Sequence, residues 1–155
     1  MFAVVLDTCV LWPSLQRDFL LSLAIEGLYR PLWSDMILEE LEFHEARKLV
    51  QRGDADPVGA AARAQRLVRM MRSAFDDALV EGWESLEGTF GLPDPDDEHV
   101  LAAAVIGGAG AIVTNNYKDF PLDLVPKHIQ VLEPSQFAAD TVAVSPNSLS
   151  RPSKP

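Results

Sequence analysis

The sequence has 155 residues, of which 48% are hydrophobic and 23% are charged. This composition is typical of one globular domain and excludes a largely disordered chain. The formal net charge of −10 at pH 7 disfavours binding of nucleic acid by overall charge alone, and suits a protein that binds cations or a basic partner.

Two features of membrane or exported proteins are missing from the sequence. No apolar run approaches the roughly 20 residues of a membrane helix, and residues 1–6 resemble a strand more than a signal peptide. Cys9 is the only cysteine, so an intrachain disulfide is impossible. We therefore expect a cytoplasmic protein without membrane contact.

Short apolar runs alternate with helical patterns along the chain, which predicts an α/β fold. The predicted strands are residues 2–6, 29–33, 78–80, 111–114 and 129–132. Helical spacing follows Pro13 as far as Gly27, and further helices are predicted at 35–52, 60–75 and 94–106, with a turn at 54–59. The run 2–6 is continuously apolar, as expected of a buried parallel strand. Residues 140–155 are rich in Ser and Pro, so we expect a domain of residues 1–139 and a mobile tail.

Acidic residues at two places are candidates for a functional site. Asp7 ends the first predicted strand, and the carboxyl ends of parallel strands form the ligand crevice of open sheets, although an acid there is also a common turn or cap residue. Glu40 lies about 60° from Ile37 on a helical projection, at the edge of the apolar sector, whereas Glu39 lies nearly opposite that sector. We expect Glu40 to reach a shared site and Glu39 to be in solvent, although a solvated face explains either residue alone.

The segment from Asp94 to Glu98 holds four acids and reads first as a capped helix start, with Asp94 as N-cap and Pro95 in the first turn. Asp97 continues an apolar stripe at i, i+3, i+4 and i+7, formed by Val100, Leu101 and Ala104. A carboxylate on an inward stripe needs a partner, because an unpaired buried charge is costly. We predict that Asp97 and Asp94 face a site and that Asp96 and Glu98 are solvated.

A further polar segment follows the predicted strand 111–114. Thr114 and Asn116 can form hydrogen bonds and Asp119 adds an acid, although these residues alone could be a plain turn. If the carboxylates of this edge converge, they raise one another's pKa values unless a cation joins them. Oxygen ligands without a His/Cys cluster favour Mg²⁺ or Mn²⁺. Such a metal can activate water for in-line attack on a phosphodiester, without a nucleophilic side chain.

Four segments taken together resemble the PIN-domain family in order and spacing: Val4–Thr8, Ile37–Leu41, Asp94–Ala104 and Ile112–Asn116. The resemblance covers about residues 1–137 and is greatest to VapC-like toxins of bacterial toxin–antitoxin pairs. It implies a three-layer α/β/α fold with a central, roughly five-stranded parallel sheet. It also implies an Mg²⁺- or Mn²⁺-dependent endoribonuclease that acts on RNA, often as a homodimer, and that is inhibited by a small antitoxin.

Carried over by position, the resemblance implies that the catalytic acids are Asp7, Glu40 and Asp97, which with Asp94 would hold metal. Thr8 matches the hydroxyl residue beside the first acid. One position departs from the pattern, because many members have Thr-x-Asp where this chain has Thr114-Asn115-Asn116. The neutral Asn116 leaves a second metal site in doubt, and Asp119 could compensate.

Three other groups of residues have competing interpretations. Arginines recur every third residue at Arg63, Arg66, Arg69 and Arg72, which could bind RNA phosphates but more simply form the solvated side of an amphipathic helix. The three tryptophans are interpreted as packing residues, and Cys9 as a thiol close to the core. His99, beside the acidic helix start, could belong to the site.

Other enzyme functions fit these residues less well. A haloacid-dehalogenase-type phosphatase needs a second acid two residues after Asp7, where Cys9 stands, and a receiver domain needs an acidic pair that is absent. The chain also has no glycine-rich phosphate loop. A PIN scaffold that binds RNA or a partner protein without cleavage stays open because of Asn116, although the three retained acids argue against it.

Overall fold

A four-stranded parallel sheet forms the centre of the computed structural model, which describes residues 2–143. Its strands are β1 (Ala3–Leu6), β2 (Arg30–Leu32), β3 (Ala111–Val113) and β4 (Gln130–Leu132), in the order β2-β1-β3-β4. In the register of the central strand, Val5 lies opposite Leu32 on one side and Ile112 on the other. The predicted α/β class and parallel sheet are therefore confirmed.

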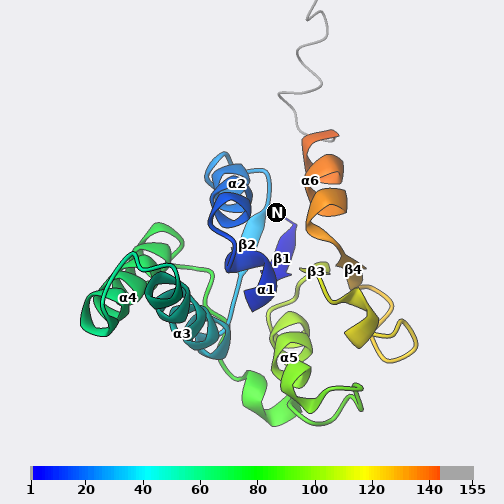
Figure 1. Ribbon diagram of the computed structural model, residues 1–155. Coiled ribbons are helices and arrows are strands. Elements are labelled where there is room, and N and C mark those ends of the chain that lie inside the picture. The colour runs from blue at the N-terminus through cyan, green and yellow to red at the C-terminus, as the bar shows by residue number, and fades with distance from the viewer. Residues whose placement is uncertain (1, 144–155) are drawn as a thin grey trace, which may run out of the picture.

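Helices cover both faces of this sheet (Figure 1). The helices α2 (Ser14–Ile25) and α6 (Pro134–Ala143) lie on one side, and α5 (Glu98–Ile106) lies on the other. The short helix α1 (Thr8–Leu11) directly follows β1. The side chains of Val4, Val5 and Leu6 in β1 are fully buried between the layers, which explains why this strand reads as a continuous apolar run.

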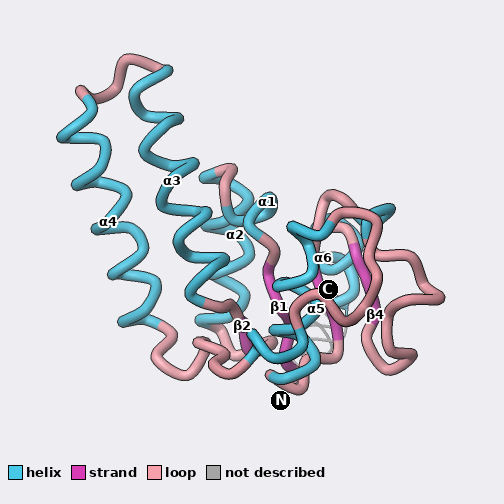
Figure 2. Tube along the Cα trace, turned by 90° about the horizontal axis from the view of Figure 1, so that it is seen from below, coloured by secondary structure: helices cyan, strands magenta, loops and turns pink. Residues whose placement is uncertain are grey.

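The helices α3 (Asp35–Gln51) and α4 (Pro57–Ala74) form a long pair that projects beside the sheet (Figure 2). The hydroxyl of Ser34 caps α3 by accepting a hydrogen bond from the Ile37 N–H at 3.1 Å. Asp56 caps α4 in the same way, with Pro57 in the first turn, so the helix begins three residues before the predicted start at residue 60. The residues of α4 that are buried lie at turn spacing: Ala60, Ala64, Val68 and Met71.

The predicted fifth strand at residues 78–80 is wrong. It is reduced to a single bridge between Trp33 and Leu79, in which Trp33 exchanges backbone hydrogen bonds with Ala78 at 3.0 Å and with Val80 at 2.8 Å. Gly82, at φ 81°, then leads into the short 3₁₀ helix η1 (Trp83–Leu86). The segment therefore leaves the sheet edge after one pairing and cannot extend it.

Helix α6 extends past the predicted boundary of the C-terminal tail at Asp140. Helix α6 continues to Ala143 and packs through Phe137, whose ring meets that of Tyr29 edge-on at 4.8 Å. The remainder of the predicted tail, residues 144–155, lies outside the described residues. Within residues 2–143, no helix has the combined length and apolar character needed to cross a membrane.

Candidate active site

The carboxylate of Asp7 lies at the carboxyl end of β1, where it also caps α1. Its Oδ1 accepts a hydrogen bond from the Thr8 N–H at 2.8 Å, and its Oδ2 accepts one from the Thr114 hydroxyl at 2.8 Å. Thr114 directly follows β3, so two residues 107 positions apart meet at one edge of the sheet. Burial raises the pKa of Asp7, because it outweighs the opposing effect of the hydrogen bonds from Thr114 and Thr8.

Glu40 reaches the same edge from α3, while its neighbour Glu39 is exposed, as helical phase predicts. Its Oε1 accepts a hydrogen bond from the Thr8 hydroxyl at 2.7 Å, and its Oε2 lies 3.2 Å from Nε2 of His99 on α5. Burial alone would raise the pKa of Glu40, but the hydrogen bonds from His99 and Thr8 lower it overall. Glu40 is therefore an ionised carboxylate with both oxygens already engaged.

His99 is the site residue that the sequence left open, and it is only 3% exposed. Burial alone would lower the pKa of His99, but the contact with Glu40 raises it overall. Its Nδ1 is buried without a hydrogen-bond partner among residues 2–143. The signal in the sequence was its position two residues after Asp97.

Asp97 lies at the junction of the 3₁₀ helix η2 (Pro95–Asp97) and α5. Its Oδ2 is buried and has no hydrogen-bond partner among the described residues. Burial raises the pKa of Asp97 to about 7, and the charges of Asp7, Asp119 and Asp94 add to the rise. The acids from three parts of the chain therefore lie close enough to repel one another.

The remaining predicted site residues surround these acids less tightly. Asp94 is exposed and caps η2, accepting from the Asp96 N–H at 2.9 Å. Asp119 ends the 3₁₀ helix η3 (Tyr117–Asp119) and is half-buried. Asn116 is exposed, and its N–H donates to the Thr114 hydroxyl at 3.0 Å.

Cys9 lies within this network as a neutral thiol. Its Sγ is 3.6 Å from Oδ2 of Asp7 and accepts from the Asn115 N–H at 3.3 Å. Burial raises the pKa of Cys9 to about 11, and the negative charge of Asp7 contributes. A thiol with this pKa is not a nucleophile at neutral pH.

Glu98 is buried, which corrects the expectation that it is solvated. Its carboxylate accepts hydrogen bonds from the N–H groups of Gly88 at 2.7 Å, Phe90 at 3.1 Å and Leu92 at 2.8 Å. Burial alone would raise the pKa of Glu98, but these backbone donors lower it overall. Glu98 thus fastens the loop 88–92 to the first turn of α5, next to Asp97.

Two of the other sequence interpretations concern the surface. The four arginines of α4 are exposed, and none of them forms an ion pair or hydrogen bond with a candidate acid within residues 2–143. Trp33 and Trp83 are packing residues, 0% and 4% exposed, but Trp12 is 42% exposed and does not fit that interpretation.

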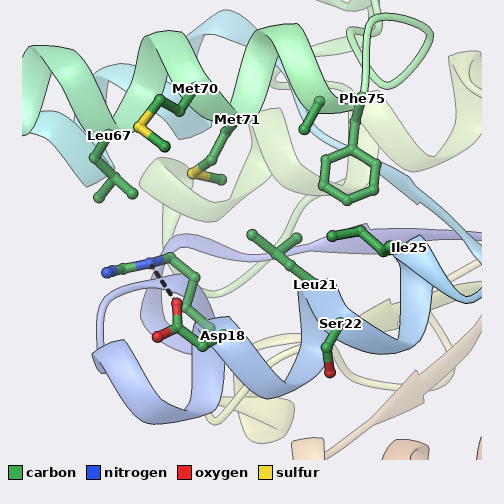
Figure 3. Close-up of a pocket in the computed structure, with 10 residues that line it drawn as sticks. Asp18, Leu21, Ser22, Ile25, Leu67, Met70, Met71 and Phe75 are labelled. Carbon is green, nitrogen blue, oxygen red and sulfur yellow. Dashed lines mark ion pairs between the residues drawn. The ribbon is translucent and has the colours of Figure 1, made fainter.

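The candidate acids lie apart from an apolar pocket of about 260 Å³ between α2 and α4. Figure 3 shows Leu21 and Ile25 of α2 facing Met70 and Met71 of α4 across this pocket. An Arg17–Asp18 ion pair, at 4.0 Å, lies at one end. The pocket is lined by none of the predicted site residues, so the acidic site is a separate edge of the molecule.

The donor set at this edge fits a divalent cation, although no three His, Cys, Asp or Glu side chains of residues 2–143 already converge in a metal-binding group. Asp97 offers a buried oxygen without a partner, and its raised pKa reflects burial and crowding by other carboxylates. A hard cation is the partner that carboxylate oxygens in this state lack. Asp7, Asp97 and Asp94 would hold it, while Glu40 is the predicted ligand least free to bind, because Thr8 and His99 engage its oxygens.

We expect Asp97→Asn to stabilise the metal-free protein at neutral pH. Because the pKa of Asp97 is about 7 in the folded state against an ordinary 3.8, the folded state binds this proton more tightly, and stability is lost as pH rises between the two values. Solvent screening of a half-buried carboxyl limits the gain to about 1–2 kcal/mol, or a melting-temperature rise of about 2–8 °C.

The measurement is thermal unfolding in EDTA at about pH 5.5 and pH 7.5, with the exposed neighbour replaced, Asp96→Asn, as the matched control. The gain over wild type should be largest at the higher pH and fall to about half of that at the lower one, which lies about midway between the two pKa values. Mn²⁺ should raise the melting temperature of wild type more than that of Asp97→Asn. Equal melting temperatures for wild type and Asp97→Asn at the higher pH would contradict the assignment.

Comparison with known proteins supports the same conclusion as the geometry. The PIN domain family model matches residues 3–118, from β1 into η3, which is most of the chain. No curated protein matches the sequence. The matched region includes Asp7, Glu40, Asp97 and Thr114, which the fold brings to one edge of the sheet. The chain therefore belongs to the PIN domain family, whose members are typically nucleases.

Proposed function

We propose that this PIN domain is a divalent-metal-dependent endoribonuclease that hydrolyses RNA phosphodiester bonds with Mg²⁺ or Mn²⁺. The observation that carries the proposal is the state of Asp97. Its Oδ2 is buried without a hydrogen-bond partner among the described residues, and burial and neighbouring acids raise its pKa to about 7. Such a cluster is unfavourable by itself and becomes favourable when a cation binds.

The residues of this chain would prepare the site before RNA arrives. Thr8 and Thr114 fix the orientation of the Asp7 carboxylate, and Thr8 also holds Glu40. Fixed carboxylates reduce the reorganisation that catalysis would otherwise require. Bound Mg²⁺ or Mn²⁺ would lower the pKa of a water and stabilise negative charge on the phosphate.

The test is cleavage of single-stranded RNA by the purified protein with Mg²⁺, Mn²⁺ or EDTA. We expect products with a 5′-phosphate and a 3′-hydroxyl in either metal, no cleavage in EDTA, and recovery when Mn²⁺ is added in excess. Cleavage that persists in EDTA would contradict the metal requirement. Binding of RNA without cleavage would favour the non-cutting scaffold that Asn116 keeps open.

We further propose that the cleavage serves as the toxin activity of a VapBC-type pair, in which a small antitoxin binds a homodimer. The resemblance of the four motif segments to VapC-like toxins supports this role, and the apolar pocket between α2 and α4 offers surface for a protein partner. Growth arrest on expression, relieved by a small protein encoded beside the gene, is the expected result.

The arginines of α4 are proposed as a secondary contact for RNA phosphates. The helix has no acidic residue, and its exposed arginines are Arg63, Arg66, Arg69 and Arg72. The chain has a net charge of −10, so four arginines on one helix form a local positive region. Such a region would attract RNA phosphates.

A further inference from the structure

Three aromatic side chains gather on the surface where α1 ends beside α3. Trp12 is 42% exposed and Phe43 is 62% exposed, and the ring of His44 lies between them. The Trp12 and His44 ring centres are 5.2 Å apart with planes at 40°, and those of Phe43 and His44 are 5.5 Å apart with planes at 77°. A cluster of aromatic rings left this open to water marks a surface that binds something.

The cluster lies one helical turn from the acidic site. The Thr8 hydroxyl donates to Oε1 of Glu40 at 2.7 Å, and four residues later on both helices Trp12 packs against His44. Four residues of α-helix advance by about 6 Å. His44 is also close enough to Glu40 to interact with its charge, so a ligand at the acids would meet the rings next.

The backbone that carries Trp12 is held firmly in place. Its N–H donates to the Thr8 carbonyl at 3.0 Å, and its carbonyl accepts from Nζ of Lys48 at 3.2 Å. Lys48 also donates to the Ser14 hydroxyl at 3.1 Å, which fixes the corner between α1 and α2. A ring on a fixed backbone, already packed against His44, has less conformational freedom to lose when a ligand stacks on it.

The chemistry of the surroundings favours a nucleobase over an extended apolar partner. Glu39 and Glu42 line one hollow with Phe43, and the exposed Arg47 follows Phe43 by four residues on α3. A protein interface of useful affinity needs a broad desolvated centre, whereas a base needs one flat ring face and tolerates a polar border. Bases in single strands expose such faces, and bases inside a duplex do not.

We propose that Trp12, supported by His44 and Phe43, stacks against a nucleobase of a single-stranded nucleic acid whose phosphodiester lies at the acidic site. The inference rests on the proposed nuclease function and adds to it a reason to prefer single strands. It assigns Trp12 to substrate binding, so its loss should weaken affinity without altering the acids.

Intrinsic tryptophan fluorescence of the cleavage-deficient variant Asp97→Asn reports on this stacking directly. Trp33 and Trp83 are 0% and 4% exposed, so Trp12 is the tryptophan that a base can reach. Oligouridylate should quench the fluorescence saturably, and duplex RNA of equal length should not. Oligothymidylate in a parallel titration distinguishes a preference for RNA from binding of any single strand.

Variants of Trp12 in the same background give the size of the effect. Trp12→Leu should abolish the quenching and weaken binding of labelled oligouridylate by about 5- to 100-fold, whereas Trp12→Phe should retain most of the affinity. Phe19→Leu is the matched control, because Phe19 is 47% exposed on α2 and lines a separate hollow with residues of α6. Circular dichroism establishes that each variant is folded. If Trp12→Leu is not, Trp12→Phe carries the test, because it should lose the quenching while it keeps most of the affinity.

The outcomes separate this inference from the proposed function. Unchanged affinity in Trp12→Leu, equal binding of duplex, or no binding of single strands by Asp97→Asn would overturn the inference, even if wild type cleaves RNA. Weaker binding in Trp12→Leu would uphold it, even if wild type shows no metal-dependent cleavage. Conversion of a dimer to a monomer in Trp12→Leu with affinity unchanged would assign the rings to a subunit interface and overturn the inference.

Discussion

Replacing Asp97 by asparagine is expected to slow metal-dependent RNA cleavage by about a thousandfold or more. Asparagine keeps the shape of the side chain but removes its charge. Because Oδ2 of Asp97 is buried and has no hydrogen-bond partner within residues 2–143, the substitution breaks no hydrogen bond of this oxygen there. The variant should therefore lose activity while its metal-free form is at least as stable as wild type.

Initial rates at a fixed Mg²⁺ concentration measure this effect, and Asp96→Asn is the matched control. Asp96 is adjacent and exposed, so its replacement should change the rate by less than about twofold. Asp7→Asn should also reduce cleavage strongly, because Asp7 is the first-strand acid that Thr8 and Thr114 hold in place. Wild-type rates in both Asp97→Asn and Asp7→Asn would refute the proposed nuclease mechanism.

Replacing Glu45 by alanine is expected to destabilise the protein by about 3–5 kcal/mol. Glu45 is 9% exposed, and its Oε1 lies 2.8 Å from Nζ of Lys48 and 3.7 Å from Nη1 of Arg17. Arg17 is itself 6% exposed. Removal of the acid would leave two cations close together in a poorly solvated position. Removing one partner of a buried ion pair costs much stability because the other charge stays buried without compensation.

Urea unfolding of Glu45→Ala measures the loss in the free energy of unfolding. In thermal unfolding, the same variant should melt about 10 °C below wild type. Glu39→Ala is the matched control, because Glu39 lies on the same helix, is exposed and forms no ion pair within the described residues. It should change stability by no more than about 0.5 kcal/mol. Similar losses in the two variants would mean that the buried pair is not stabilising α3 against the α1–α2 corner.

Helical phase predicted the exposure of several acidic side chains correctly because it depends only on local geometry. It predicted Glu40 at the sheet edge and Glu39 in solvent, and in the structure Glu40 bonds to Thr8 while Glu39 is exposed. It also favoured Asp97 over the exposed Asp96. A regular helix fixes the direction of each side chain once its apolar stripe is known.

Helical phase failed to predict the burial of Glu98 on α5, because residues on all sides of this helix are buried. Every residue from Glu98 to Ala104 is buried, so no stripe separates inward from outward positions. The burial of Glu98 depends on the loop 88–92, whose N–H groups it accepts, and that of His99 depends on Glu40 from another helix. Partners so distant in the chain leave no periodic signal.

The sheet was predicted well except at its edge. A continuous apolar run predicts a buried parallel strand, as in β1. The pairing of residues 78–80 depends instead on how many residues run alongside Trp33, and only Leu79 pairs with it. Helix α6 was missed because only Phe137 and Thr141, one turn apart, join Pro134 as its buried residues. Its place is set by the ring of Tyr29, which no local pattern indicates.

The hydrogen bond between Thr114 and Asp7 has a consequence for synthesis of the protein. It joins residues 107 positions apart, and β3, which precedes Thr114, pairs directly with β1. A nascent chain that has emerged only as far as Asp97 carries Asp7, Glu40 and Asp97 but lacks the strand that completes their edge. Since long-range pairing of parallel strands is slow to form, the candidate acids of a partly synthesised chain would not yet be held at one edge.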